Sequence, residues 1–133
     1  MSMYLLLEYC RNRRKTNMNR RDDKFGKCPY VTSQKILSGK WAILILHELE
    51  DGPRRFNELQ HQIDITQATL STQLKSLEQN GLISRTVYPE VPPRVEYAMT
   101  GIGLKFKPVL QSIEEWGNEY IEYLHIRNKD RSG

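Results

Sequence analysis

The stretch that decides the fold of this chain is residues 56–99, which read FNELQHQIDITQATLSTQLKSLEQNGLISRTVYPEVPPRVEYAM. Apolar residues at helical spacing predict a short helix over residues 56–63 and a longer helix over residues 67–80. The polar turn Asp64-Ile65-Thr66 joins them, and its threonine is a good N-cap for the second helix. Gly81 stands in the C′ position that ends this helix. This pair of helices is a helix-turn-helix in shape.

Two short strands follow the helix pair. Residues 82–88 and 94–99 alternate in the manner of strands, and the proline-rich residues 89–93 separate them. The spacing predicts a hairpin with a longer loop at its tip. A helix-turn-helix followed directly by a hairpin is a winged helix, in which the second helix enters the major groove of DNA.

Two further helices are expected before this stretch. Pro29 opens the first, which Ser38-Gly39 ends. Residues 41–49 form the second; they are nearly all apolar and are expected at the centre of the core. Asp51-Gly52-Pro53 breaks that helix. The predicted fold class is mainly α with a small β-hairpin: a winged helix-turn-helix domain with N- and C-terminal dimerisation helices.

The last predicted helix begins at the cap residue Thr100 and runs to about His125. Pro108 in its early part marks either a kink or the true start. An apolar stripe on this helix is expected to form a dimer interface, because an exposed apolar face of this size is costly. The stripe consists of Val109, Ile113, Trp116, Tyr120 and Leu124. The first helix is expected to pack beside it across the two-fold axis.

Length and composition limit the class of protein. The 133 residues are 38% hydrophobic and 27% charged, as in a single globular domain. No apolar run approaches the roughly 18 residues that span a membrane, and residues 4–7 are too short for a signal-peptide core. We therefore expect a cytoplasmic protein without membrane association. With two cysteines, a disulfide scaffold is not expected.

The net charge of +4 divides unevenly along the chain. Residues 11–27 hold eight basic and two acidic residues, whereas residues 28–133 hold twelve basic and thirteen acidic residues. We therefore predict a basic N-terminal extension over residues 1–27, a winged-helix domain over residues 28–125 and a tail over residues 126–133. Translation starting at Met18 is a further hypothesis, under which part of the extension is not native; the intact mass of the protein from its native locus tests it.

The second helix of the pair carries the functional signal. Leu70, Leu74 and Leu77 define its buried side, and no acidic residue precedes Glu78. An ordinary solvated helix of this length would more often carry Glu–Lys pairs, although a plain polar surface is the alternative. Hydroxyl and amide side chains can hydrogen-bond to base edges, and basic side chains can neutralise phosphates.

The predicted DNA-binding residues lie on this helix, before the first helix of the pair and on the hairpin. Expected at the bases are Thr69, Ser71, Thr72 and Gln73, and Gln67 at the start of the helix is also expected to bind DNA. Expected at the phosphates are Arg54, Arg55, Lys75, Arg85 and Arg94. Arg94, beside the wing tip, is also placed to reach the minor groove. Each cation taken alone is more often a solvated charge, so the prediction rests on the set.

Several segments together resemble one family. They are Cys28-Pro29, the run from Ile36 to Trp41, Ile43–Leu46, Gly52–Leu59, Leu70–Glu78, Gly81–Arg85 and Val91–Tyr97. The chain resembles the HxlR-type bacterial transcription regulators, relatives of the MarR winged-helix proteins, over residues 28 to about 120. The resemblance implies a homodimer on a palindromic operator of double-stranded DNA. It also implies that a cysteine near the N-terminus senses electrophiles or oxidants, which is the position of Cys28 here.

Cys28 precedes Pro29 at a helix start and lies near Lys24 and Lys27. Helix N-termini and neighbouring cations lower the pKa of a thiol, so Cys28 is a candidate redox sensor; a small buried apolar residue is the alternative. A Cys10–Cys28 bridge, within or between chains, is a third possibility, although Cys10 has no counterpart in the family pattern.

Other functions find little support. The three histidines lack metal-site spacing, and His47 is expected to be packed in the core. No catalytic residue, metal site or cofactor is predicted, so an enzyme is not expected. Two alternatives stay open: a winged-helix protein-interaction module that does not bind DNA, and a small-molecule-gated regulator without a redox role. The sequence indicates no inducer.

Overall fold

The computed structural model describes residues 24–132, which belong to two compact units. The first unit ends at Ala42 and the second begins at Ile43. In the first unit, Cys28 is the N-cap of helix α2 (Pro29–Ile36). The Thr32 hydroxyl donates to the Cys28 carbonyl at 2.7 Å and accepts from the Gly26 amide at 2.9 Å, which ties the preceding turn to the helix.

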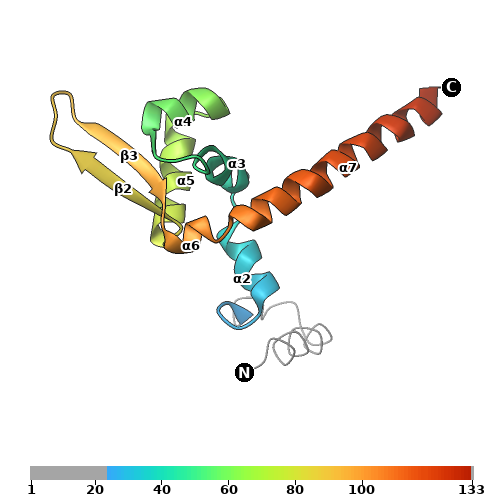
Figure 1. The fold of residues 1–133 in the computed structure, drawn as a ribbon, viewed down its shortest axis with the longest axis horizontal. Helices are drawn as coiled ribbons and strands as arrows, with labels where there is room; N and C mark the ends of the chain where they lie inside the picture. Colours follow the sequence, from blue (N-terminus) through green and yellow to red (C-terminus); the bar gives the residue numbers. More distant parts are fainter. Residues whose placement is uncertain (1–23, 133) are drawn as a thin grey trace. The chain divides into compact units, whose positions relative to one another are not determined.

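The second unit contains the predicted helix-turn-helix, preceded by α3 (Ala42–Glu48) (Figure 1). Helix α4 (Phe56–Ile63) ends at Asp64, whose left-handed conformation (φ 59°) turns the chain. Thr66 is the N-cap of helix α5 (Gln67–Gln79), and its hydroxyl accepts from the Thr69 amide. The core of the unit is built from side chains that are less than 2% exposed: Ile45, Leu46, Leu49, Leu59, Leu70, Leu74, Leu77 and Ile83. The expected N-cap and leucine stripe are therefore confirmed.

The hairpin is part of a three-stranded antiparallel sheet. Strands β2 (Ile83–Tyr88) and β3 (Arg94–Met99) form the predicted pair, and β1 (Arg54–Arg55) adds to the other edge of β3. The sequence did not reveal β1, because a two-residue strand has no periodicity to detect. Its pairing of Arg54 with Tyr97 and Arg55 with Glu96 fixes the start of α4 against the wing.

The C-terminal part consists of two helices instead of one. Thr100 caps a short helix, α6 (Gly101–Leu104), and α7 (Lys107–Ser132) follows, so Pro108 marks the true start of the long helix. The expected end near His125 is wrong: α7 is 26 residues long and ends at Ser132. Only one residue of α7, Leu110, is buried. The rest of the helix therefore gets most of its stability from its own hydrogen bonds or from a surface that residues 24–132 do not supply.

The expectation for His47 is also wrong. Its side chain is 57% exposed, and Nδ1 lies 3.1 Å from Oε2 of Glu50. At 100° per residue, the buried side of α3 passes through Ile45, Leu46 and Leu49, and residue 47 points away from it. The same geometry leaves two other apolar residues of this helix exposed, Ile43 and Leu44. An apolar helix is thus buried on one side only.

Candidate nucleic-acid interface

The exposed face of α5 carries the predicted base-contacting residues. Leu70, Leu74 and Leu77 are at most 1% exposed, whereas Gln67, Ser71, Thr72 and Lys75 are exposed, with Thr69 and Gln73 half-buried at the flanks. Two hydroxyls are partly engaged: Thr69 Oγ1 accepts from Thr66 at 2.7 Å, and Thr72 donates to the Ala68 carbonyl at 3.0 Å. The amides and the other hydroxyls of this face are open to a base edge.

Lys75 and Arg85 have no acidic partner among the described residues. Both are exposed, and within residues 24–132 neither takes part in an ion pair. Arg85 lies on β2, the strand that follows α5 in the chain, and it is paired with Tyr97 of β3. Since neither charge is compensated, each can neutralise a phosphate without first giving up a carboxylate.

Arg54 and Arg55 stand at the start of α4 and share one acid. Nη1 of Arg54 lies 3.9 Å and Nε of Arg55 lies 4.0 Å from the carboxylate of Glu58. Arg54 Nε also donates to the Glu48 carbonyl at 3.3 Å. Because these ion pairs are long and exposed, they hold the side chains weakly.

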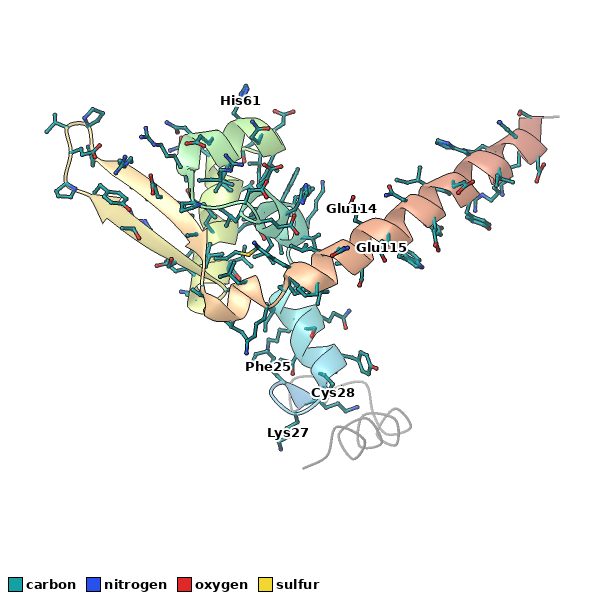
Figure 2. All side chains as sticks on the ribbon, viewed as in Figure 1. Phe25, Lys27, Cys28, His61, Glu114 and Glu115 are labelled. Atoms are coloured by element: carbon teal, nitrogen blue, oxygen red, sulfur yellow. The ribbon has the colours of Figure 1, made fainter. Side chains whose placement is uncertain are left out.

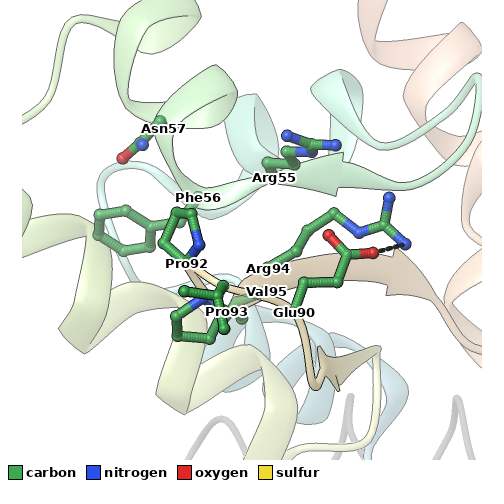
Figure 3. A pocket seen from close by; sticks show the side chains of 9 residues that line it. Arg55, Phe56, Asn57, Glu90, Pro92, Pro93, Arg94 and Val95 are labelled. Atoms are coloured by element: carbon green, nitrogen blue, oxygen red, sulfur yellow. Dashed lines mark ion pairs between the residues drawn. The ribbon is translucent and has the colours of Figure 1, made fainter.

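Arg94 sits in a cluster of its own, consisting of Tyr88, Glu90, Arg94 and Glu96, which we call the Arg94 cluster. Its Nη2 lies 3.3 Å from Oε1 of Glu90, and its Nε lies 3.5 Å from Oε1 of Glu96. The guanidinium carbon lies 4.1 Å from the centre of the Tyr88 ring. Figure 3 shows Glu90 and Arg94 joined beside a hollow of about 390 Å³, which Arg55 also lines.

The sheet register separates two of the predicted cations. Residues directly opposite one another in an antiparallel pair share a face, and successive residues alternate between faces. Arg85 is paired with Tyr97, and Arg94 is paired with Tyr88. Arg85 and Arg94 therefore lie on opposite faces of the wing, and the structure does not bring them together.

Sequence reasoning missed the roles of Tyr88, Glu90 and Glu96. A signal was present, because pairing the two strands outward from the proline-rich tip places Tyr88 opposite Arg94. Glu90 lies four residues before Arg94 in a loop, where helical i,i+4 reasoning does not apply. Only the folded tip brings that carboxylate to the guanidinium.

The predicted thiol lies at the start of α2 (Figure 2). Cys28 is 3% exposed and is not a free thiol in this structure. Cys10, the alternative of a bridge between the two cysteines and most of the predicted extension lie outside the described residues.

The apolar stripe on α7 is open to solvent. Trp116 is 65% exposed, Tyr120 and Val109 are exposed, and Ile113 and Leu124 are half-exposed. The Trp116 and Tyr120 rings stack with centroids 5.2 Å apart, and Tyr123 continues the row at 5.5 Å. About two turns of helix, from Trp116 to Tyr123, thus present aromatic side chains that nothing in the described chain covers.

In the part of the chain from 24 to 132, no group of three or more His, Cys, Asp and Glu side chains could hold a metal ion. No helix in that part is both long and apolar enough to cross a membrane.

Known proteins resemble this chain in sequence and in structure. The uncharacterised HTH-type transcriptional regulator YdeP of Bacillus subtilis strain 168 is 42% identical over 108 residues, which are 80% of this chain and 84% of YdeP. A putative MarR-family regulator from Porphyromonas gingivalis W83 superimposes with a TM-score of 0.67 at 40% identity, covering 70% of this chain and 92% of that one. The redox regulator HypR in its oxidised form superimposes with a TM-score of 0.65 at 38% identity. This match covers 69% of this chain and 96% of the HypR chain.

These likenesses confirm the winged-helix fold and the expectation that the chain is not an enzyme. The model of the HxlR-like helix-turn-helix family matches residues 36–125, which include the whole of α4, α5 and the wing. This chain therefore belongs to the HxlR-like helix-turn-helix family of transcriptional regulators.

Proposed function

We propose that this transcriptional regulator binds a palindromic operator as a homodimer, with α5 of each subunit in the major groove of one half-site. The two recognition helices would then lie about 34 Å apart, or a small multiple of that distance. The observation that carries the proposal is the exposed face of α5, which holds hydroxyls, amides and Lys75 but no acid before Glu78. Action on chromosomal DNA would place the protein in the cytoplasm.

The proposed contacts divide into two kinds. Those to bases come from Gln67, Thr69, Ser71, Thr72 and Gln73 on α5. Those to phosphates come from Lys75 and Arg85, with Arg54, Arg55 and Arg94 at the borders of the surface. The absence of an ion pair at Lys75 and Arg85 supports giving these two the largest share of the phosphate attraction.

The dimer is proposed from the stripe on α7. Val109, Trp116 and Tyr120 are exposed along one side of the helix, and aromatic residues are the most common anchors of protein interfaces. A second copy of the helix would cover them and remove the cost of leaving them in water.

We also propose that Cys28 senses oxidants or electrophiles. Its N-cap position on α2 supports this role, since in the reduced protein a helix N-terminus would stabilise the thiolate. The similar protein HypR is a redox regulator by name. DNA affinity should differ between diamide-treated and reduced protein, and Cys28→Ser should abolish the difference. Equal responses of the Cys28→Ser variant and the unaltered protein would contradict the role.

DNA binding is tested with the promoter region upstream of the protein's own gene. A gel-shift or anisotropy titration should show binding that weakens steeply as salt is raised from about 50 to about 200 mM. No binding even at low salt would contradict the proposal and would favour a protein-interaction module.

A further inference from the structure

The Arg94 cluster has more acid than base. One guanidinium faces two carboxylates: that of Glu90, which is 54% exposed at the tip, and that of Glu96, which is 24% exposed on β3. The charges of Glu90, Glu96 and Arg94 sum to −1, and Arg55, paired with Glu96 in the sheet register, adds a cation on the same face of the wing. A DNA-binding wing gains nothing in affinity from the carboxylate of Glu90, since phosphates repel carboxylates.

The three nitrogens of Arg94 have different environments. Nη2 faces Glu90, and Nε is shielded from solvent beside Glu96 without a hydrogen-bond partner. Nη1 has no partner in the described chain. With the guanidinium held over the Tyr88 ring and 28% of the side chain exposed, the group is fixed in orientation but largely neutralised.

The position of Glu90 makes it the adjustable member of the cluster. Glu96 is held in β3, opposite Arg55 of β1 and Thr86 of β2. Glu90 belongs to the loop at the tip, and its ion pair with Arg94 borders the open hollow next to α4 (Figure 3). Removing the charge of Glu90 would leave Arg94 stacked on Tyr88 and facing one carboxylate instead of two.

We propose that Glu90 attenuates the attraction of the wing for DNA: it cancels the charge of Arg94 and so weakens binding to DNA of any sequence. This inference rests on the proposed DNA-binding function. Phosphate attraction is independent of sequence and dominates non-specific binding, and non-specific sites far outnumber operators in a genome. A counter-charge on the wing thus reduces the fraction of regulator held on bulk DNA.

The test uses a duplex of random sequence, so the operator need not be known. Glu90→Gln keeps the size of the side chain and an oxygen that can accept from Arg94, but it removes the charge. This variant should bind the random duplex about two- to thirtyfold more tightly per dimer, which is the range that corresponds to the energy of two exposed ion pairs. Its affinity should also fall more steeply with salt, by about one unit of slope per DNA-bound subunit.

Two comparisons separate this role from a general effect of charge. In the unaltered protein, Arg94→Gln should weaken binding to the random duplex, because it leaves two carboxylates without a counter-charge. In the Glu90→Gln background it should return the affinity to about that of the unaltered protein. Glu115→Gln removes an exposed acid from α7 (Figure 2), on the side away from the aromatic stripe, and should leave binding to the random duplex unchanged. Circular dichroism checks that each variant is folded.

Three results would overturn the inference: a Glu90→Gln variant that binds as the unaltered protein does, a Glu90→Gln/Arg94→Gln double variant that still binds more tightly than the unaltered protein, or an equal gain from Glu115→Gln. If the unaltered protein shows no salt-dependent binding to any duplex, the proposed function itself fails. The two failures are therefore distinguishable.

Discussion

Replacing Lys75 with alanine removes the one cation on the exposed face of α5. The side chain is exposed and has no ion pair in the described chain, so the substitution leaves no buried charge and opens no cavity. Alanine is also a better helix former than lysine. The variant should fold normally, and any loss of DNA binding would then reflect the lost phosphate contact.

The size of the effect follows from the number of contacts. Each phosphate contact contributes about 0.9 to the slope of log affinity against log salt. A dimer that loses both copies of Lys75 should therefore show a slope flatter by about 1.8. Over an approximately fourfold rise in salt, this difference changes the ratio of the DNA affinities of the unaltered protein and the Lys75→Ala variant by about twelvefold.

The assay is fluorescence anisotropy with promoter DNA at several salt concentrations between about 50 and about 200 mM. Lys129→Ala serves as the matched control, since it removes an exposed lysine near the end of α7. An unchanged slope for Lys75→Ala, or an equal flattening for Lys129→Ala, would refute the assignment of Lys75 to a phosphate.

Three further predictions concern stability and assembly. In urea unfolding, Gly103→Ala should lower the free energy of unfolding by about 1–3 kcal/mol, because a Cβ there would overlap the carbonyl oxygen of Leu82. Gly101→Ala is the control: a Cβ there meets open space, so the free energy of unfolding should not fall measurably. Thr66→Ala should cost about 1 kcal/mol in the same assay through loss of the α5 N-cap, and no loss would contradict that cap. Trp116→Glu should leave the helix content by circular dichroism intact but produce a monomer in sedimentation velocity; a dimer of unchanged affinity would place the interface elsewhere.

Local patterns were enough to predict most of the elements. The leucines of α5 repeat at helical spacing, Thr66 caps the helix, and Gly81 adopts a positive φ of 80° after it. Each of these signals acts within a few residues of the chain, so it can be recognised without knowing what packs nearby. The long helix was also predicted, but its end was not. Residues 126–132 contain no proline or glycine, so the helical hydrogen bonds continue to Ser132.

The candidate surface was predicted in composition but not in its pairing. All five phosphate-binding candidates lie on or beside α4, α5 and the wing. The sequence did not show which of these candidates carry an uncompensated charge. In the structure, Glu58 faces Arg54 and Arg55, and Glu90 contacts Arg94 at the wing tip.

By itself, the sequence determined the order of helices and strands, the buried side of α5 and the polar character of its other side, because periodicity and capping are local properties. The tertiary structure decided that Arg54 and Arg55 form a third strand, that Arg85 and Arg94 lie on opposite faces of the wing, and that Arg94 is neutralised. These depend on strand register and on contacts between side chains, which exist only once segments distant in the chain have packed together.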